Sequence, residues 1–173
     1  HIYNRDIERK RNEADWVSAG VVWTDDIEVV LASDADVVVE LIGGVTDAAE
    51  WIRRSLKAGK DVVTANKQLL AHHGRELAGI ARENGKSLLF EASVAGGIPI
   101  IHGVQQGLAG DKLFRLRGIL NGTCNYILTT MRETGRDFDA VLAEAQELGY
   151  AEADPAFDVN GVDASHKIAI QAL

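Results

Sequence analysis

The segment of residues 149–167 holds the side chains best suited to acid–base chemistry. It contains four carboxylates and ends on a lysine: Glu152, Asp154, Asp158, Asp163 and Lys167. Asp163 and Lys167 are four residues apart, so on a helix they share a face. A lysine held among carboxylates could donate and accept a proton. A surface ion pair worth at most about 0.5 kcal/mol would have the same spacing, so the spacing alone leaves both interpretations open.

Residues 1–67 carry the elements that would position a second group of candidate residues. Short apolar runs alternate there with helical patterns, which indicates βαβ units and a parallel sheet. The β-branched run at residues 36–42 predicts a strand buried on both faces. Thr46 is expected to cap the next helix and Gly59 to stop it, before another strand at residues 61–64.

The expected ligand edge of this sheet follows from the strand ends. Ligands of open parallel sheets bind outside the carboxyl ends of the strands, and Gly43, Gly44 and Lys67 follow successive strands there. Arg5 follows the first strand, where an arginine can meet the 2′-phosphate of NADP. A solvated basic helix start would explain Arg5 equally well. The Gly-rich fingerprint that should precede this strand is not in the chain.

The second half of the chain is predicted to contain a glycine loop, one strand and several helices. The loop at residues 92–99 follows a strand at 87–91 and leads into a helix from Pro99. Such a loop can bind an anion through N–H groups or a cation through carbonyls, and a tight turn explains its glycines as well. Residues 115–120 predict a strand. Thr123 is expected to cap the helix after it, and Asp137 and Gly149 to bound the next one.

Composition excludes several classes of function. The net charge of −8, from 26 acidic and 18 basic residues, argues against nucleic acid or an anionic membrane as the main partner. No apolar run approaches the roughly 20 residues that span a bilayer. The single cysteine, Cys124, fits a reducing compartment, hence the cytoplasm, and is expected to be a small buried residue.

Calcium and other side-chain metal sites are not expected. A calcium loop aligned on Gly161 would place Lys167 at its last ligand position. The histidines lack helical metal-ligand spacing and are expected to be surface or structural; they are His72, His73, His102 and His166.

Six segments together resemble homoserine dehydrogenase, in the order in which that family carries them. They are residues 64–67, 90–99, 118–126, 145–146, 149–155 and 161–167. The likeness covers nearly the whole chain, although Cys124 stands where the family more often has threonine. The resemblance implies NAD(P)-dependent interconversion of L-homoserine and L-aspartate 4-semialdehyde, in threonine, methionine and isoleucine biosynthesis.

The resemblance also implies a fold. We expect an α/β chain with a partial Rossmann-type, parallel-sheet NAD(P)-binding domain at residues 1–95. An α+β catalytic and dimerisation domain would follow at residues 96–173, giving a homodimer. The chain opens without methionine and ends on an apolar helical pattern without a stop signal. We therefore expect a fragment whose flanks carried the Gly-rich loop and the rest of the second domain.

The resemblance assigns roles to individual residues. Lys167 would move the proton, Asp163 would hold Lys167, and Lys67 would lie at the seam between nicotinamide and substrate. The substrate would be bound by Glu152, Tyr150, Gly122, Thr123 and Asp158, with Glu152 on its amino group. The cofactor, with NADP slightly favoured over NAD, would be bound by Arg5, Gly43, Gly44, Thr64, Ala65 and Lys67. A monovalent cation, Na⁺ or K⁺, would be bound by backbone carbonyls at Glu91, Val94, Gly96 and Ile98.

Two rival interpretations remain at this stage. One is another Rossmann oxidoreductase acting on a small amino acid. The other is a non-catalytic dimerisation or amino-acid-binding module derived from such an enzyme, because the chain lacks the phosphate-binding loop. In either case the isolated chain is expected to bind cofactor weakly or not at all.

Overall fold

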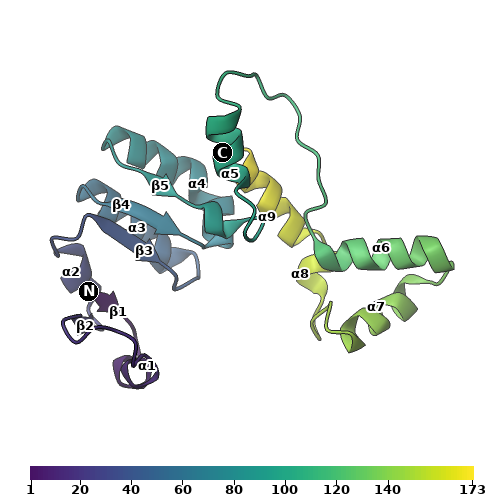
Figure 1. Cartoon of the computed structure of the whole chain (residues 1–173), viewed down its shortest axis with the longest axis horizontal. Coiled ribbons are helices and arrows are strands. Elements are labelled where there is room, and N and C mark those ends of the chain that lie inside the picture. Colours follow the sequence, from purple (N-terminus) through teal and green to yellow (C-terminus); the bar gives the residue numbers. More distant parts are fainter. The chain divides into compact units, whose positions relative to one another are not determined.

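The computed structural model describes all residues 1–173 and divides them into two compact units (Figure 1). The strand unit, His1–Phe90, contains every β-strand, and the helical unit, Glu91–Leu173, contains none. No helix is both long enough and apolar enough to cross a bilayer.

The strand unit has two parallel sheets. The smaller sheet pairs β1 (Ile2–Tyr3) with β2 (Trp23–Thr24). The larger has the order β3-β4-β5, formed by β3 (Val37–Glu40), β4 (Asp61–Thr64) and β5 (Leu88–Leu89). Every strand pair is parallel, which confirms the predicted α/β class.

Two helices supply most of the core of the strand unit. The helices of this unit are α1 (Ile7–Glu13), α2 (Ile27–Leu31), α3 (Thr46–Lys57) and α4 (Lys67–Glu83). Side chains of α3, α4 and β4 are at most 1% exposed, namely Ile52, Leu56, Val62, Leu69, Leu70 and Leu77. Burial of each such side chain contributes roughly 1.5–3 kcal/mol.

The prediction that the strand at residues 36–42 is buried on both faces is wrong. Val37 and Val39 are 48% and 59% exposed, whereas Glu40 at the end of β3 is buried. Val39 lies beside Val63 and Leu89 in the register, and Leu89 is exposed too. Crossover connections between parallel strands are right-handed. Both helices, α3 and α4, therefore pack on the same face of the sheet, and the opposite face is exposed to solvent.

The start of α3 also differs from the prediction. Its N-cap residue is Val45, which makes no side-chain cap bond, and Thr46 is the first helical residue. The chain after Gly44 therefore enters the helix without the expected hydroxyl cap. Gly59 has φ +79°, a left-handed conformation that favours glycine, and it follows the end of α3 as predicted.

The helical unit is built from short helices around a small core. Its elements are η1 (Glu91–Ser93), α5 (Ile100–His102), η2 (Gly103–Gly107), α6 (Gly122–Thr134), α7 (Phe138–Glu147), α8 (Ala156–Val159) and α9 (Val162–Gln171). Ile127 of α6 packs with Val141 and Ala145 of α7 and with Ala151. Asp137 caps α7 and Gly149 follows its last turn, as predicted.

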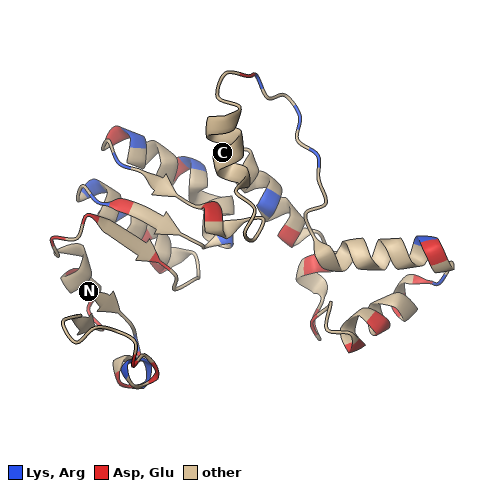
Figure 2. Cartoon of the chain, viewed as in Figure 1, with Lys and Arg blue, Asp and Glu red and all other residues tan.

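The predicted strand at residues 115–120 is wrong. The segment is extended but pairs with no strand, and Phe114 and Ile119 are 90% and 77% exposed. Basic residues occur in the segment and just before it, at Lys112, Arg115 and Arg117, and Figure 2 colours such positions blue on the backbone. Alternating residues favour an extended backbone, but a strand also needs a neighbour to take its hydrogen bonds, and the helical unit offers none.

Candidate active site

An open cavity of about 570 Å³ lies in the helical unit. It is lined by Asn121, Gly122, Thr123, Tyr126, Gly149, Tyr150, Asp158, Asp163 and Lys167. The structure therefore brings together, around one cavity, the catalytic and substrate residues predicted in this unit, except Glu152. Asn121, Tyr126 and Gly149 join them.

Lys167 and Asp163 form a partly buried ion pair. Nζ of Lys167 lies 2.6 Å from Oδ2 of Asp163 and donates to the carbonyl oxygen of Leu120, also at 2.6 Å. The Asp163 side chain is 6% exposed and that of Lys167 is 24% exposed. Because a buried carboxylate loses its hydration, this pair is not the solvated surface ion pair that the spacing allowed.

Asn121 joins the start of α6 to the buried Asp163 and the half-buried Asp158. Its Oδ1 accepts from the backbone N–H of Cys124 at 2.8 Å, so Asn121 is the N-cap of α6. Its Nδ2 donates to Oδ1 of Asp158 at 2.7 Å and to Oδ2 of Asp163 at 2.9 Å. The predicted cap, Thr123, is wrong, because that residue lies inside α6. The stronger preference of asparagine for N-cap positions was the signal for Asn121.

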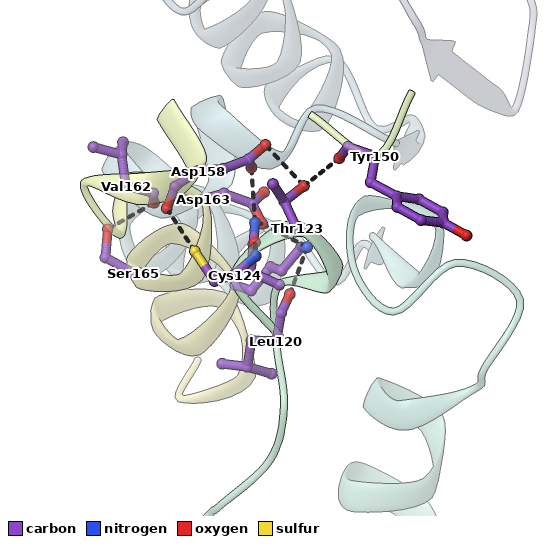
Figure 3. A network of polar contacts seen from close by, with 10 residues as sticks. Leu120, Thr123, Cys124, Tyr150, Asp158, Val162, Asp163 and Ser165 are labelled. Carbon is purple, nitrogen blue, oxygen red and sulfur yellow. Dashed lines mark hydrogen bonds and ion pairs between the residues drawn. The ribbon is translucent and has the colours of Figure 1, made fainter. Parts of the chain in front are cut away.

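Thr123 and Cys124 also contact Asp158, at its second carboxylate oxygen and its carbonyl oxygen (Figure 3). The Thr123 hydroxyl donates to the carbonyl oxygen of Tyr150 at 2.7 Å and lies 3.3 Å from Oδ2 of Asp158. The Cys124 thiol donates to the carbonyl oxygen of Asp158 at 3.3 Å. Burial, with the charges of Asp158 and Asp163, raises the pKa of Cys124. The thiol thus stays protonated and packs, rather than acting as a nucleophile.

Tyr150 lines the cavity, and its carbonyl oxygen accepts a hydrogen bond from the Thr123 hydroxyl. Its ring contacts that of Tyr126, with centroids 4.8 Å apart. The Tyr126 hydroxyl donates to Oε1 of Glu144 at 2.5 Å, and Arg136 pairs with the same carboxylate. The hydrogen bond to Glu144 raises the pKa of Tyr126. Tyr126 is therefore a neutral phenol that fixes the position of Tyr150.

Glu152 does not line the cavity. Its side chain is exposed, and its carbonyl oxygen accepts from Nε2 of Gln146 at 3.1 Å. The same amide donates to the carbonyl oxygen of Ala153 at 3.2 Å. Gln146 thus anchors the turn that carries Glu152, close in sequence to Tyr150.

The strand unit has a cavity of its own, of about 770 Å³, at the carboxyl ends of β1 and β3. Its lining includes Arg5, Gly43 and Gly44, which the sequence assigned to the cofactor, but not Thr64, Ala65 or Lys67. Gly43 and Gly44 both have φ +74°, a conformation that side chains disfavour. Nη2 of Arg5 pairs with Oδ2 of Asp47 at 2.8 Å.

A buried carboxylate shapes this glycine loop. Glu40 accepts from the backbone N–H groups of Ile42 at 2.9 Å and Gly43 at 3.1 Å, and from the Thr64 hydroxyl at 2.6 Å. Asn66, the N-cap of α4, donates to the carbonyl oxygen of Gly44 at 2.7 Å. Sequence reasoning missed Glu40, although a glutamate at the end of a valine strand was a signal. Lys67 begins α4 directly after Asn66.

The candidate cation loop is tightly bonded. The Glu91 carboxylate accepts from the backbone N–H groups of Ile101 at 2.9 Å and His102 at 2.8 Å. Ala95 and Gly96 have φ +60° and +59°, so the loop turns sharply. The carbonyl oxygen of Ile98 already accepts from Ile100 at 2.8 Å. A carbonyl oxygen that accepts one hydrogen bond keeps a second lone pair.

Comparisons with protein-family models match both parts of the chain. Residues 1–91 match the family described as "Homoserine dehydrogenase, NAD binding domain". Residues 99–173 match the family described as "Homoserine dehydrogenase". The two matches together cover nearly the whole sequence.

Similar whole proteins carry the same name. The homoserine dehydrogenase of Pseudomonas aeruginosa is 52% identical over 164 residues, which are 95% of this chain and 38% of that protein. That of Bacillus subtilis is 48% identical over 168 residues, 97% of this chain and 38% of that protein. The chain thus spans well under half the length of these relatives.

Solved structures agree. The S. aureus homoserine dehydrogenase at pH 7.5 has a TM-score of 0.80 at 42% identity, covering 99% of this chain and 39% of that one. A hyperthermophilic archaeal homoserine dehydrogenase in complex with NADPH has a TM-score of 0.75 at 29% identity, covering 98% of this chain and 54% of that one.

Proposed function

Because the chain belongs to the homoserine dehydrogenase family, we propose that it forms the substrate pocket and part of the NAD(P) site of an enzyme interconverting L-homoserine and L-aspartate 4-semialdehyde. The observation that carries the proposal is the Lys167–Asp163 pair in a cavity lined by the family's motif residues. Residues 1–95 would serve the cofactor and residues 96–173 the substrate and the homodimer. The single cysteine favours the cytoplasm.

Lys167 is the proton donor and acceptor of this reaction. An ammonium group has three N–H donors, and Lys167 gives one to Asp163 and one to the carbonyl oxygen of Leu120. The third serves the substrate oxygen. In homoserine oxidation the neutral amine accepts the hydroxyl proton, and in semialdehyde reduction the ammonium returns it to the carbonyl oxygen.

The polar residues around Lys167 orient the substrate. Homoserine carries an ammonium and a carboxylate group besides its hydroxyl. Tyr150, Gly122, Thr123 and Asp158 would form the cavity wall. Glu152, exposed on the turn after Tyr150 and outside the lining, would bind the ammonium group only from the rim. Lys67 keeps its proposed place at the seam between nicotinamide and substrate.

The cofactor supplies the hydride step, since a bound nicotinamide gives or takes a hydride. Gly43 and Gly44 would let the cofactor approach the backbone closely, helped by Thr64, Ala65 and Lys67. Arg5 would bind the 2′-phosphate, which slightly favours NADP over NAD. Its side chain is 71% exposed, and an exposed ion pair such as Arg5–Asp47 is weak enough to exchange for a phosphate.

A monovalent cation, Na⁺ or K⁺, would be held by backbone carbonyls at Glu91, Val94, Gly96 and Ile98. Support comes from the sharp turn at Ala95 and Gly96. The Glu91 side chain would act indirectly, because it is already bonded to the start of α5.

The test is Lys167→Ala in the protein encoded by the complete reading frame. Loss of the proton-transfer group should lower kcat for semialdehyde reduction by roughly 10²–10⁴-fold, measured from NADPH absorbance, while NADPH binding is unchanged. Lys112→Ala is the matched control, because Lys112 is an exposed lysine outside the cavity. Turnover retained in Lys167→Ala would reject the role of Lys167. Homoserine binding without any hydride transfer by the unmutated protein would support the non-catalytic module instead.

A further inference from the structure

Asn121 is an uncharged side chain that contacts two aspartates of the cavity, the half-buried Asp158 and the buried Asp163, through one amide group. It is 9% exposed, and each N–H of its amide goes to a different carboxylate, at 2.7 Å to Asp158 and 2.9 Å to Asp163. Its oxygen is bonded to the backbone of α6. Both N–H groups of the amide nitrogen are therefore donated to carboxylates.

The two aspartates come from different elements and carry like charge. Asp158 lies on α8 and Asp163 on α9, separated by Gly161 with φ +77°. Neighbouring carboxylates repel, and partial burial strengthens the repulsion. Lys167 offsets the charge of Asp163, with which it pairs at 2.6 Å. The Asn121 amide, 37 and 42 residues earlier in the chain, is the donor that spans both groups.

We propose that Asn121 is a positioning residue, which keeps Asp158 and Asp163 at a fixed spacing and, through Asp163, holds the Lys167 ammonium in place for proton transfer. This inference rests on the role proposed above for Lys167. Asn121 touches neither the proton nor the substrate in this scheme. It acts on the group that holds the lysine.

The titratable groups around Lys167 define what a substitution of Asn121 would change. Asp163 comes from the lysine's own helix, Asp158 from α8, Tyr150 from the turn after α7, and Tyr126 and Cys124 from α6. The pKa values of Tyr126 and Cys124 are raised, so both groups are neutral near pH 7. The two carboxylates are thus the charges that Lys167 meets at working pH.

Asn121→Asp is the main test, made in the protein of the complete reading frame. Aspartate is as good an N-cap as asparagine and nearly the same size, but it replaces both donors with a third carboxylate. The added charge favours the ammonium form of Lys167. The rising limb of kcat for homoserine oxidation, which needs the neutral amine, should move to higher pH. Misplacement of the lysine should also lower kcat about 10- to 100-fold.

Asn121→Ser keeps the test decisive if the aspartate variant fails to fold. Serine also caps a helix, but it cannot supply two N–H donors and adds no charge. Its kcat should fall about 10- to 100-fold, with the KM for NADPH unchanged. Asp137→Ala is the control, because Asp137 caps α7 outside the cavity. That variant should lower the melting temperature and leave the pH profile as it was.

Two results would overturn the inference. One is an Asn121→Asp variant whose kcat, and whose dependence of kcat on pH, match those of the unmutated protein. The other is a fall in kcat in Asn121→Ser that tracks only its melting temperature, as in Asp137→Ala. NMR titration of the Lys167 side chain separates this inference from the proposed function. A changed Lys167 titration in Asn121→Asp while Lys167→Ala retains turnover would show that Asn121 acts on Lys167 but would reject the proposed function, and with it the link to proton transfer. An unchanged titration rejects the inference even if Lys167→Ala is inactive.

Discussion

Asp163 is the residue on which the state of Lys167 depends most directly. Its carboxylate is 2.6 Å from the ammonium nitrogen and is nearly inaccessible to water. An opposite charge at this distance attracts the ammonium group and holds it in place. In the proposed reaction that group would be the proton donor of semialdehyde reduction.

Asp163→Asn should therefore shift the pH profile in the direction opposite to Asn121→Asp. Asparagine keeps the size of the side chain and removes the charge that attracts the ammonium group. The rising limb of kcat for homoserine oxidation should therefore move to lower pH, as measured by initial rates across pH. Asp139→Asn is the control, because Asp139 is exposed on α7. A limb that stays in place would show that Asp163 does not set the charge of Lys167.

Local spacing predicted some of these residues and missed others for a physical reason. The spacing of Asp163 and Lys167 needs only a helix, and the helix is there. The buried Asp163 carboxylate accepts a hydrogen bond from Asn121, 42 residues away, and no local pattern encodes that contact. Thr123 was mistaken for the cap because threonine and asparagine both cap helices. The choice between them depends on where Asp158 and Asp163 lie.

At the scale of elements, α3 and α4 are joined by a bidentate ion pair. Nε and Nη2 of Arg53 on α3 donate to Oε1 and Oε2 of Glu76 on α4, at 2.5 and 2.9 Å. The hydrogen bond from Arg53 is the main cause that lowers the pKa of Glu76 from 4.5 to about 2. A carboxyl group whose pKa is lower in the folded state adds stability above its unfolded pKa, and this stability is lost as pH falls towards the folded value.

Glu76→Gln should lower the free energy of unfolding at pH 7 by about 0.5–1 kcal/mol, because the Glu76 side chain is 47% exposed and solvent screens the pair. The difference from the unmutated protein should narrow as pH falls from 4.5 towards 2, the interval between the two pKa values. Urea unfolding at several pH values measures it. Glu83→Gln, an exposed residue at the end of α4, is the matched control. A difference that is constant with pH would contradict the assignment.

The sequence predicts a helix well, because the helix's own residues supply its hydrogen bonds. It predicts a strand or a buried sheet face less well, because these need a neighbouring strand or a second layer. The helix at residues 46–57 buries Ala49, Ile52 and Leu56 as its period of 3.6 residues predicts. The extended segment at 115–120 has the alternation of a strand but no neighbour, so it stays unpaired. Val37 and Val39 are exposed for a related reason, since a buried face requires a second layer.

At the scale of the whole molecule, the cavity proposed for the cofactor lies in the strand unit and the Lys167–Asp163 pair proposed for proton transfer lies in the helical unit. The chain covers 38% of the relatives from P. aeruginosa and B. subtilis. A dinucleotide is normally held by a glycine loop and by the backbone N–H groups at a helix N-terminus. The affinity of the isolated chain for a cofactor therefore depends on how many of these N–H donors the chain contains.

The 173-residue chain alone should bind NADP weakly or not at all. The N–H groups of Ile42 and Gly43 face the cavity loop but are already donated to Oε1 of Glu40, at 2.9 and 3.1 Å. Arg5 is the cationic side chain in the cavity lining, and it is paired with Asp47. The donors that remain for a pyrophosphate in this lining are those at the uncapped start of α3, without a Gly-rich loop beside them.

Titration calorimetry of the purified chain with NADP measures this directly. We expect a dissociation constant well above the micromolar range, and Arg5→Ala should abolish any residual preference for NADP over NAD, because the 2′-phosphate is the group that differs. Lys57→Ala is the control, since Lys57 is an exposed cation at the end of α3 and outside the cavity. Submicromolar binding by the 173-residue chain would show that Gly43, Gly44 and Arg5 suffice for the cofactor. The N–H groups of Ile42 and Gly43 would then have to bind a phosphate in addition to, or in place of, Oε1 of Glu40.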